Sequence, residues 1–155
     1  GDLLAARQTL DGASNSTRGI FTGGQDTPTI DNVIQYITMA SVGNAIDFGN
    51  LTIGLSSTGA CSDGVRGLIS HGYPAPAGGI DYINIATTSN GLDFGNQTIA
   101  KESRTGVGNG YRAFWCGGAP SVNTIDWCTV NTLGNCVDWG DLTDADAMQP
   151  TVSGD

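Results

Sequence analysis

Charged side chains are scarce in this chain of 155 residues, and basic ones are the scarcest. Asp, Glu, Lys and Arg together make up 14% of the residues, whereas an average soluble domain has about 25%. Six Lys and Arg stand against fifteen Asp and Glu, which gives a formal net charge of −9. A field of this sign repels phosphate groups, so we expect no nucleic-acid partner and no attraction to anionic membranes.

Long apolar runs and the common catalytic motifs are also missing. No apolar run approaches the ~20 residues that cross a bilayer, so we expect no membrane insertion. The one histidine, His71, belongs to no His-Glu-x-x-His pattern, and neither Cys-x-x-Cys nor Gly-x-Ser-x-Gly occurs. We therefore predict no catalytic residue, no metal ligand, no cofactor and no enzyme activity. Calcium stays open because Asp and Asn crowd the turns at 44–50 and 141–146.

Small and turn-forming residues are abundant instead. Glycine accounts for 24 residues, and Asn, Ser and Thr are frequent. Glycine, Asn and Thr rank low in helix propensity, whereas short strands joined by tight turns use them readily. The composition predicts an all-β protein.

One phrase occurs three times along the chain. It reads Asp47-Phe48-Gly49-Asn50, then Asp93-Phe94-Gly95-Asn96, then Asp138-Trp139-Gly140-Asp141, at spacings of 46 and 45 residues. A period of this length is typical of a unit of four short strands that stacks on its neighbours. The predicted domain therefore spans 1–143, with units at about 3–51, 52–97 and 98–142, followed by an extended arm or linker at 144–155.

The chain opens on Gly1-Asp2-Leu3, which resembles the end of one more copy. This leaves two expectations open, a processed product or a piece of a longer array.

Each unit contains four strand-like segments. The first lies at 3–13, 52–60 and 98–107; the second is an Arg, a short apolar run and a glycine stop; the third and fourth each carry an aromatic residue. The arginines are predicted to bind turn carbonyls or a neighbouring Asp, with a ligand-binding arginine ring as the alternative. The positions assigned to the scaffold are Arg18, Arg66, Arg112, Gly23, Gly24, Gly117, Gly118, Tyr36, Tyr82, Trp127, Phe48, Phe94 and Trp139.

A glycine pair followed by two spaced aromatics resembles the kelch motif. The first copy has Gly23-Gly24, Tyr36 and Phe48, and the third has Gly117-Gly118, Trp127 and Trp139. The second departs from the pattern, because His71-Gly72 replaces the glycine pair. Kelch repeats form four-stranded blades of β-propellers, so the resemblance implies blade-like units.

The chain also resembles repeat-rich virion proteins of marine tailed phages. The similar phrasing is Ser16-Thr17-Arg18-Gly19-Ile20-Phe21 and 80–88, and the likeness extends to about Leu142. It implies a structural, decorating or tail-fibre part of a virion, placed at the particle surface. The expected partners are other virion proteins, copies of the chain itself in an oligomer, and host-surface glycans or receptors.

Closure of the fold leaves an alternative open. Propellers typically have 4–8 blades, so three units need a longer chain or a second chain, and two chains give six blades. Three units of four strands also describe a β-trefoil or β-prism, which predicts a self-contained glycan-binding lectin. A hydrolase with paired acids is a third interpretation, but Asp47, Asp93 and Asp138 show no asymmetry that would mark one active site.

Binding is expected in the loops that differ most between the units. These loops lie at 25–31, 73–78 and 119–122, and loops on a repeated scaffold commonly carry the contacts. The candidate residues are Tyr73, His71, Gln25 and Asp26.

The four cysteines are Cys61, Cys116, Cys128 and Cys136. Cys128 and Cys136 flank one turn at a spacing that suits cross-strand neighbours, so a disulfide between them is one hypothesis. The other is that all four are small buried apolar side chains.

Overall fold

Strands make up the regular structure of the protein. The computed structural model describes residues 1–74 and 78–147, and within those ranges it contains strands, turns and loops but no helix. Over the same part of the chain, no helix is long and apolar enough to span a membrane. The all-β class expected from composition is confirmed.

Most strands form three antiparallel sheets, each made of four strands in chain order. Sheet 1 contains β1 (Asp11–Ser14), β2 (Arg18–Thr22), β5 (Val33–Thr38) and β6 (Ile46–Asn50). Sheet 2 contains β7 (Gly59–Ser62), β8 (Arg66–Ser70), β9 (Gly79–Asn84) and β10 (Leu92–Asn96). Sheet 3 contains β11 (Thr105–Gly108), β12 (Arg112–Cys116), β13 (Val122–Thr129) and β14 (Val137–Asp146).

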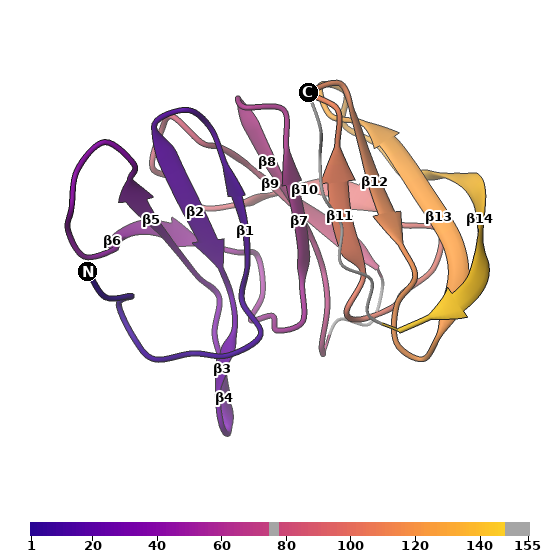
Figure 1. Ribbon diagram of the computed structural model, residues 1–155, viewed down its shortest axis with the longest axis horizontal. Coiled ribbons are helices and arrows are strands. Elements are labelled where there is room, and N and C mark those ends of the chain that lie inside the picture. Colours follow the sequence, from indigo (N-terminus) through magenta and orange to yellow (C-terminus); the bar gives the residue numbers. More distant parts are fainter. Residues whose placement is uncertain (75–77, 148–155) are drawn as a thin grey trace.

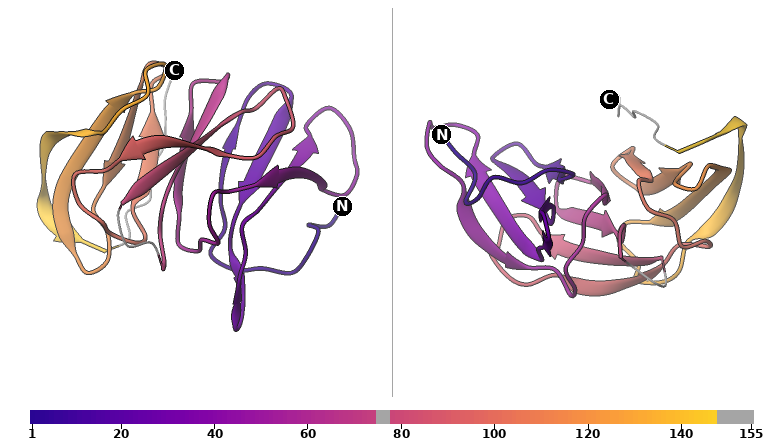
Figure 2. Two further views of the ribbon diagram at one scale, coloured as in Figure 1. Left: turned by 180° about the vertical axis from the view of Figure 1, so that it is seen from behind. Right: turned by 90° about the horizontal axis from the view of Figure 1, so that it is seen from below.

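The sheets stand face to face in a curved row, with sheet 2 in the middle (Figures 1 and 2). The first strands of the sheets, β1, β7 and β11, pack beside one another. In the view from below, the row forms an open arc with sheets 1 and 3 at its two ends (Figure 2, right). The arc differs from a β-trefoil or β-prism, in which the first and third units would also lie against each other.

Two apolar cores fill the two spaces between the sheets. The first contains Ile20, Ile34 and Phe48 from sheet 1 and Ile69 and Ile83 from sheet 2. Sheet 2 is therefore covered on both sides, and neighbours on opposite faces of β8, Leu68 and Ile69, both have 0% exposure. This explains the continuous apolar run of the second segment in sheet 2, where both faces of β8 are buried.

The second core lies between sheets 2 and 3. It contains Leu68, Ile80 and Phe94 from sheet 2 and Trp115 and Cys128 from sheet 3. Phe48 and Phe94, the aromatic residues of the repeated phrase, thus have the same role: Phe48 packs in the first core and Phe94 in the second.

The first segments are shorter strands than the sequence predicts. Only 11–14, 59–62 and 105–108 are strands, and the residues before them are irregular. The residues after β6 and after β10 link the last strand of one sheet to the first strand of the next. Thr9, Ser57 and Ser103 have φ values of 60°, 52° and 56°. A left-handed residue interrupts an extended strand, so each strand begins only after it.

Two further features depart from the four-segment pattern. A small hairpin of β3 (Gln25–Asp26) and β4 (Thr29–Ile30) projects from sheet 1 (Figure 1). The last strand, β14, continues to Asp146, where it pairs with Val122, and so includes the first residues of the expected arm. The rest of that arm, 148–155, lies outside the described residues.

Candidate functional site

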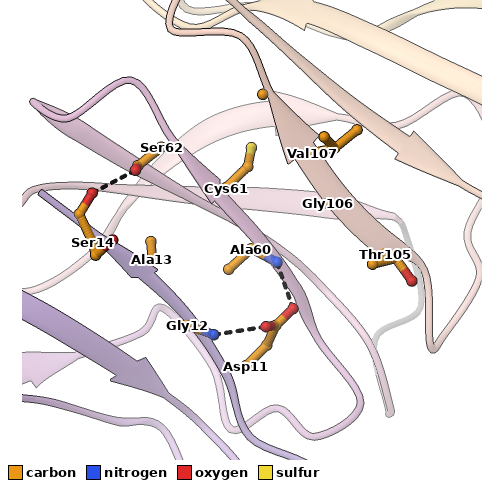
Figure 3. A pocket seen from close by; sticks show the side chains of 11 residues that line it. Asp11, Gly12, Ala13, Ser14, Ala60, Cys61, Ser62, Thr105, Gly106 and Val107 are labelled. Atoms are coloured by element: carbon orange, nitrogen blue, oxygen red, sulfur yellow. Dashed lines mark hydrogen bonds between the residues drawn. The ribbon is translucent and has the colours of Figure 1, made fainter. Parts of the chain in front are cut away.

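The inner side of the arc carries a pocket of about 280 Å³ between β1, β7 and β11 (Figure 3). Its walls are main chain and small side chains, including Gly12, Ala60 and Gly106. Glycine and alanine let the three strands approach closely, but they offer no functional group to a ligand. The pocket is therefore a seam between sheets, and its polar side chains are Asp11, Ser14, Ser62 and Thr105.

Asp11 is the acidic residue of this pocket, and its carboxylate is engaged in holding the strands together. It accepts hydrogen bonds from the main-chain N–H groups of Gly12 (2.7 Å) and Ala60 (2.8 Å), as Figure 3 shows. Burial raises the pKa of Asp11, and the two main-chain donors oppose that shift. Cys61 lies in the same wall, and burial raises the pKa of its thiol. A neutral thiol is a poor nucleophile.

A second hollow of about 240 Å³ lies between loop and linker residues of sheets 2 and 3. Tyr73, Lys101, Glu102 and Ala119 line it. Tyr73 is 52% exposed, and its main chain is held by reciprocal hydrogen bonds to Ser56 of 2.8 and 2.9 Å. The hollow thus combines an open aromatic side chain with one cation and one anion.

The other predicted loop residues lie in different places. Gln25 and Asp26 line a separate hollow of about 360 Å³ with Arg7, at the hairpin of sheet 1. His71 faces inward: its side chain is 13% exposed and its Nε2 lies 3.0 Å from Oδ1 of Asp81. The structure therefore does not bring the four candidates together. Residues 75–77 of the second loop lie outside the described residues.

The pair of His71 and Asp81 has a superficial likeness to a hydrolytic triad. The third group is Thr52, whose hydroxyl donates to the carboxylate of Asp81 at 2.8 Å and whose N–H does so at the same distance. In a triad the hydroxyl must instead bind the imidazole, which removes its proton. The hydrogen bonds from Thr52 fasten the linker after β6 to Asp81 in β9. They leave no activated nucleophile.

A buried ion pair takes the corresponding place in sheet 3. Arg104 binds the carboxylate of Asp126, and both side chains are 0% exposed. Arg104 also donates to the carbonyls of Trp115 (2.7 Å) and Thr124 (3.0 Å), while Thr98 donates to Asp126. The sequence analysis did not select Arg104 because no other unit has an arginine there; its one signal is that Lys and Arg are few in this chain.

The three arginines assigned to the scaffold lie over aromatic rings. The guanidinium carbon is 4.5 Å from the ring centre of Tyr36 for Arg18, 5.2 Å from Tyr82 for Arg66 and 4.4 Å from Trp127 for Arg112. Arg18 and Arg66 also reach the next sheet. Arg18 donates to the carbonyl of Ile85 at 2.9 Å, and Arg66 donates to that of Val130 at 3.1 Å.

The aromatic and glycine positions of the scaffold are also arranged alike. Edge-to-face ring pairs with centroid distances of 5.8 to 6.2 Å are Tyr36 with Phe48, Tyr82 with Phe94 and Trp127 with Trp139. The glycine pairs have positive φ values, namely Gly23 (60°), Gly24 (93°), Gly117 (63°) and Gly118 (130°).

All four cysteines are free thiols, so the Cys128–Cys136 disulfide is not formed. The two side chains are nevertheless neighbours: a hydrogen bond between the Cys136 and Cys128 thiols, together with burial, raises the pKa of Cys136. Cys61, Cys128 and Cys136 are buried in the core between sheets 2 and 3, whereas Cys116 is half-buried. The packing agrees with small apolar side chains.

Within residues 1–74 and 78–147, no group of three or more His, Cys, Asp or Glu side chains is placed to hold a metal ion. Comparison with known proteins adds no family: no protein-family model matches the chain, and no curated protein matches it.

Proposed function

We propose that this chain is a non-enzymatic module of blade-like repeats of about 46 residues, and that it serves as a structural or receptor-facing part of a phage virion. One observation carries the proposal. The residues that recur from sheet to sheet make the contacts between sheets, as Arg18 does with Ile85 and Arg66 with Val130. The recurring sequence is thus explained by assembly, and the loops are left to carry binding.

The side chains with chemical reactivity support a non-enzymatic role. Asp11 is bound to main-chain N–H groups, Asp81 to His71 and Thr52, and Asp126 to Arg104. Each such carboxylate holds a linker or strand in place through these contacts. A general acid or base needs a free proton-transfer path to a substrate.

Tyr73 is the proposed centre of ligand contact. An exposed tyrosine offers an apolar ring face and a hydroxyl, which suits the mixed apolar and polar faces of a sugar ring. Lys101 and Glu102 in the same hollow supply a hydrogen-bond donor and an acceptor. The expected ligand is a neutral host-surface glycan, because the net charge of −9 opposes anionic ones.

Weak contacts suffice for this role if the module is displayed many times. A virion carries numerous copies of its structural proteins, and linking many weak sites raises the overall affinity by about 10²–10⁴. A shallow hollow of about 240 Å³ fits such a site better than it fits a tight single-ligand pocket.

The proposal is tested by binding to host cells and to glycan arrays, with the module displayed on beads. The Tyr73→Ala variant is expected to lose about fivefold or more in apparent affinity, since a sugar–aromatic contact is worth on the order of 1 kcal/mol or more. Tyr111→Ala is the matched control, because Tyr111 is 57% exposed in a turn outside the hollow. Equal binding by both variants, or no binding by the parent chain, would reject the site.

A further inference from the structure

The two ends of the arc present faces that correspond to the faces buried inside it. We call the side of sheet 3 turned away from sheet 2 the tail face, with Arg112, Phe114, Trp127 and Trp139. We call the side of sheet 1 turned away from sheet 2 the head face, with Phe21, Ile37 and Met39. We infer that the tail face of one copy of this chain binds the head face of a second copy, and that two copies close a ring of six sheets.

The tail face has the residues of an interface between sheets, but no further sheet packs on it in the single chain. Trp139 is 53% exposed, whereas Phe48 and Phe94, at the same place in sheets 1 and 2, are 3% and 2% exposed. Its ring packs edge-to-face on Phe114 and Trp127, with centroids 5.4 and 5.8 Å apart. Three adjoining aromatic side chains on one open sheet face are therefore placed where both other sheets have their apolar core.

Arg112 indicates which group a partner of the tail face must supply. Arg18 and Arg66 each donate to a main-chain carbonyl of the following sheet, at Ile85 and Val130. Arg112 has the same stack on an aromatic ring, but its guanidinium makes no hydrogen bond to another sheet within 1–74 and 78–147. The partner must therefore present a carbonyl at the corresponding place.

The head face presents that carbonyl at Met39. The N–H groups of Met39, Ile85 and Val130 bind the carbonyls of corresponding turn residues, Thr17, Val65 and Tyr111, at 2.9 to 3.0 Å. Met39 thus has the register position of the two residues that accept an arginine. Its side chain is 57% exposed, whereas Ile85 and Val130 are 0% and 1% exposed.

The glycine of the repeated phrase lies against the next sheet in sheets 1 and 2 but has no neighbour in sheet 3. A Cβ on Gly49 or Gly95 would lie 2.3 Å from a carbonyl oxygen of the next sheet, at Ser89 or Gly134. Gly140 has the same backbone, with φ of 142° against 146° for the other two. A Cβ on Gly140, however, would meet nothing within 4 Å. The tail face is shaped to receive a loop.

Gly1 and Asp2 occupy the corresponding loop of the head face in the single chain. Asp2 donates to Oδ1 of Asn44 at 3.0 Å and accepts from Ala45 at 2.9 Å. Asn50 makes the same two contacts with Asn90 and Gly91, at 3.0 and 2.8 Å. Asp141 of a second copy offers the same N–H and carbonyl, so it replaces Asp2 without a loss of hydrogen bonds, while the aromatic rings become covered.

The number of copies follows from the number of sheets. Closed propellers typically have 4–8 blades, and the described residues of one chain supply three four-stranded sheets. Two chains give six, which lies in that range, whereas three chains give nine. A head-to-tail contact that does not close would instead grow into an open filament. This inference uses the blade-like stacking proposed above but is independent of the virion role and of Tyr73.

The test is the mass of the full chain in solution, measured by sedimentation velocity over a concentration series. The parent chain is expected to have twice the mass of one chain. Trp139→Asp on the tail face and Met39→Asp on the head face are each expected to have the mass of one chain at the same concentrations. Val65→Asp is the control, because Val65 is equally exposed at 58% but lies in a turn of the middle sheet.

Mixing the two interface variants separates a head-to-tail contact from a symmetric one. In a mixed pair, one of the two contacts carries both substitutions and the other carries neither, so the mixture is expected to regain a dimer weaker than the parent. Circular dichroism of each variant checks that the sheets are retained. A parent chain that stays monomeric, a series of larger masses, dimers unaffected by either substitution, or a mixture that stays monomeric would each overturn the inference.

Failure here and failure of the proposed function are distinguishable. A monomeric chain that still binds glycans through Tyr73 rejects the ring alone, and a dimer without glycan binding rejects the binding site alone.

Discussion

The guanidinium of Arg18 in sheet 1 donates a hydrogen bond to the main-chain carbonyl of Ile85 in sheet 2, at 2.9 Å. The same group lies over the ring of Tyr36 in its own sheet, 4.5 Å from the ring centre. One side chain therefore joins an aromatic ring within its sheet to the peptide backbone of the next. A contact of this kind needs no partner side chain, so it tolerates sequence change in the neighbouring sheet.

The arginine contact predicts unequal effects for equivalent arginines. Arg66→Ala removes a hydrogen bond from a charged donor to Val130 and a cation–π stack on Tyr82. The free energy of unfolding is expected to fall by about 2–3 kcal/mol. Arg112→Ala removes only the exposed stacking on Trp127 and Trp139 in the single chain and should cost about 1 kcal/mol. Urea denaturation at a concentration where the chain is monomeric measures both, and equal losses would contradict this account of the arginines.

The glycine of the repeated phrase predicts a second unequal pair. Gly95→Ala and Gly140→Ala face a similar backbone strain of about 1–2 kcal/mol, because both residues have φ near 140–146°. Gly95→Ala must also displace the carbonyl of Gly134, which lies 2.3 Å from the new Cβ. It should therefore cost a further ~1–3 kcal/mol. Urea midpoints of the two variants give the difference, and no difference would mean that the close approach has little energetic weight.

The buried ion pair predicts a large loss when one partner is removed. Arg104→Met leaves the carboxylate of Asp126 without its cation at a fully buried place, which should cost about 3–5 kcal/mol. Arg7→Met also breaks a pair, with Asp31, but Asp31 is 33% exposed and water compensates it. That variant should lose about 1 kcal/mol or less.

Adding Asp126→Asn to Arg104→Met distinguishes lost charge pairing from lost packing. The double variant is expected to recover part of the stability, because the unpaired buried charge is gone. A double variant less stable than Arg104→Met would show that Asp126 contributes through its other hydrogen bonds instead.

The buried thiols predict a loss of stability in alkali. Burial raises the pKa of Cys61 above its ordinary value of 9.0 in the folded chain, whereas unfolding restores that ordinary value. The stability that the protonated Cys61 thiol contributes is complete below pH 9. As the pH rises above 9, the free energy of unfolding falls by at most about 1.4 kcal/mol per pH unit for one thiol, because the unfolded chain loses the proton first. Comparing urea denaturation at pH 8 and pH 10 measures it.

Cys61→Ala is the matched variant for the thiol effect, since it removes the titrating group. Its free energy of unfolding should change less between pH 8 and pH 10 than that of the parent. In the native chain at pH 8, half-buried Cys116 is expected to react with a thiol reagent before the three buried cysteines do. First reaction at Cys61 would contradict its burial.

The repeated features of the fold could be predicted from the sequence because repetition amplifies a weak signal. The all-β class followed from glycine and turn-forming residues, and the second to fourth segments coincide with strands in each sheet. The segments at 3–13, 52–60 and 98–107 were predicted as strands over too long a range. Leu55, in the segment 52–60, is buried because this linker passes between sheets, and the sequence pattern does not reveal such a path.

The features that occur once could not be found in the same way. Arg104 has no counterpart in the other units, so nothing in the sequence links it to Asp126 before the chain folds. His71 was placed in a binding loop because it replaces a glycine, yet it serves as the partner of Asp81. Lys101 and Glu102 meet Tyr73 through the packing of two linkers and loops, which spacing along the chain does not show.

The most direct measurement for the whole account is an experimental structure of the protein at a concentration where it is fully assembled. We predict six sheets in a closed ring, with the guanidinium of Arg112 on the carbonyl of Met39 of a second copy and Trp139 buried between the two copies. A structure in which Arg112 and Trp139 remain open to solvent, or in which a different surface joins the copies, would contradict it.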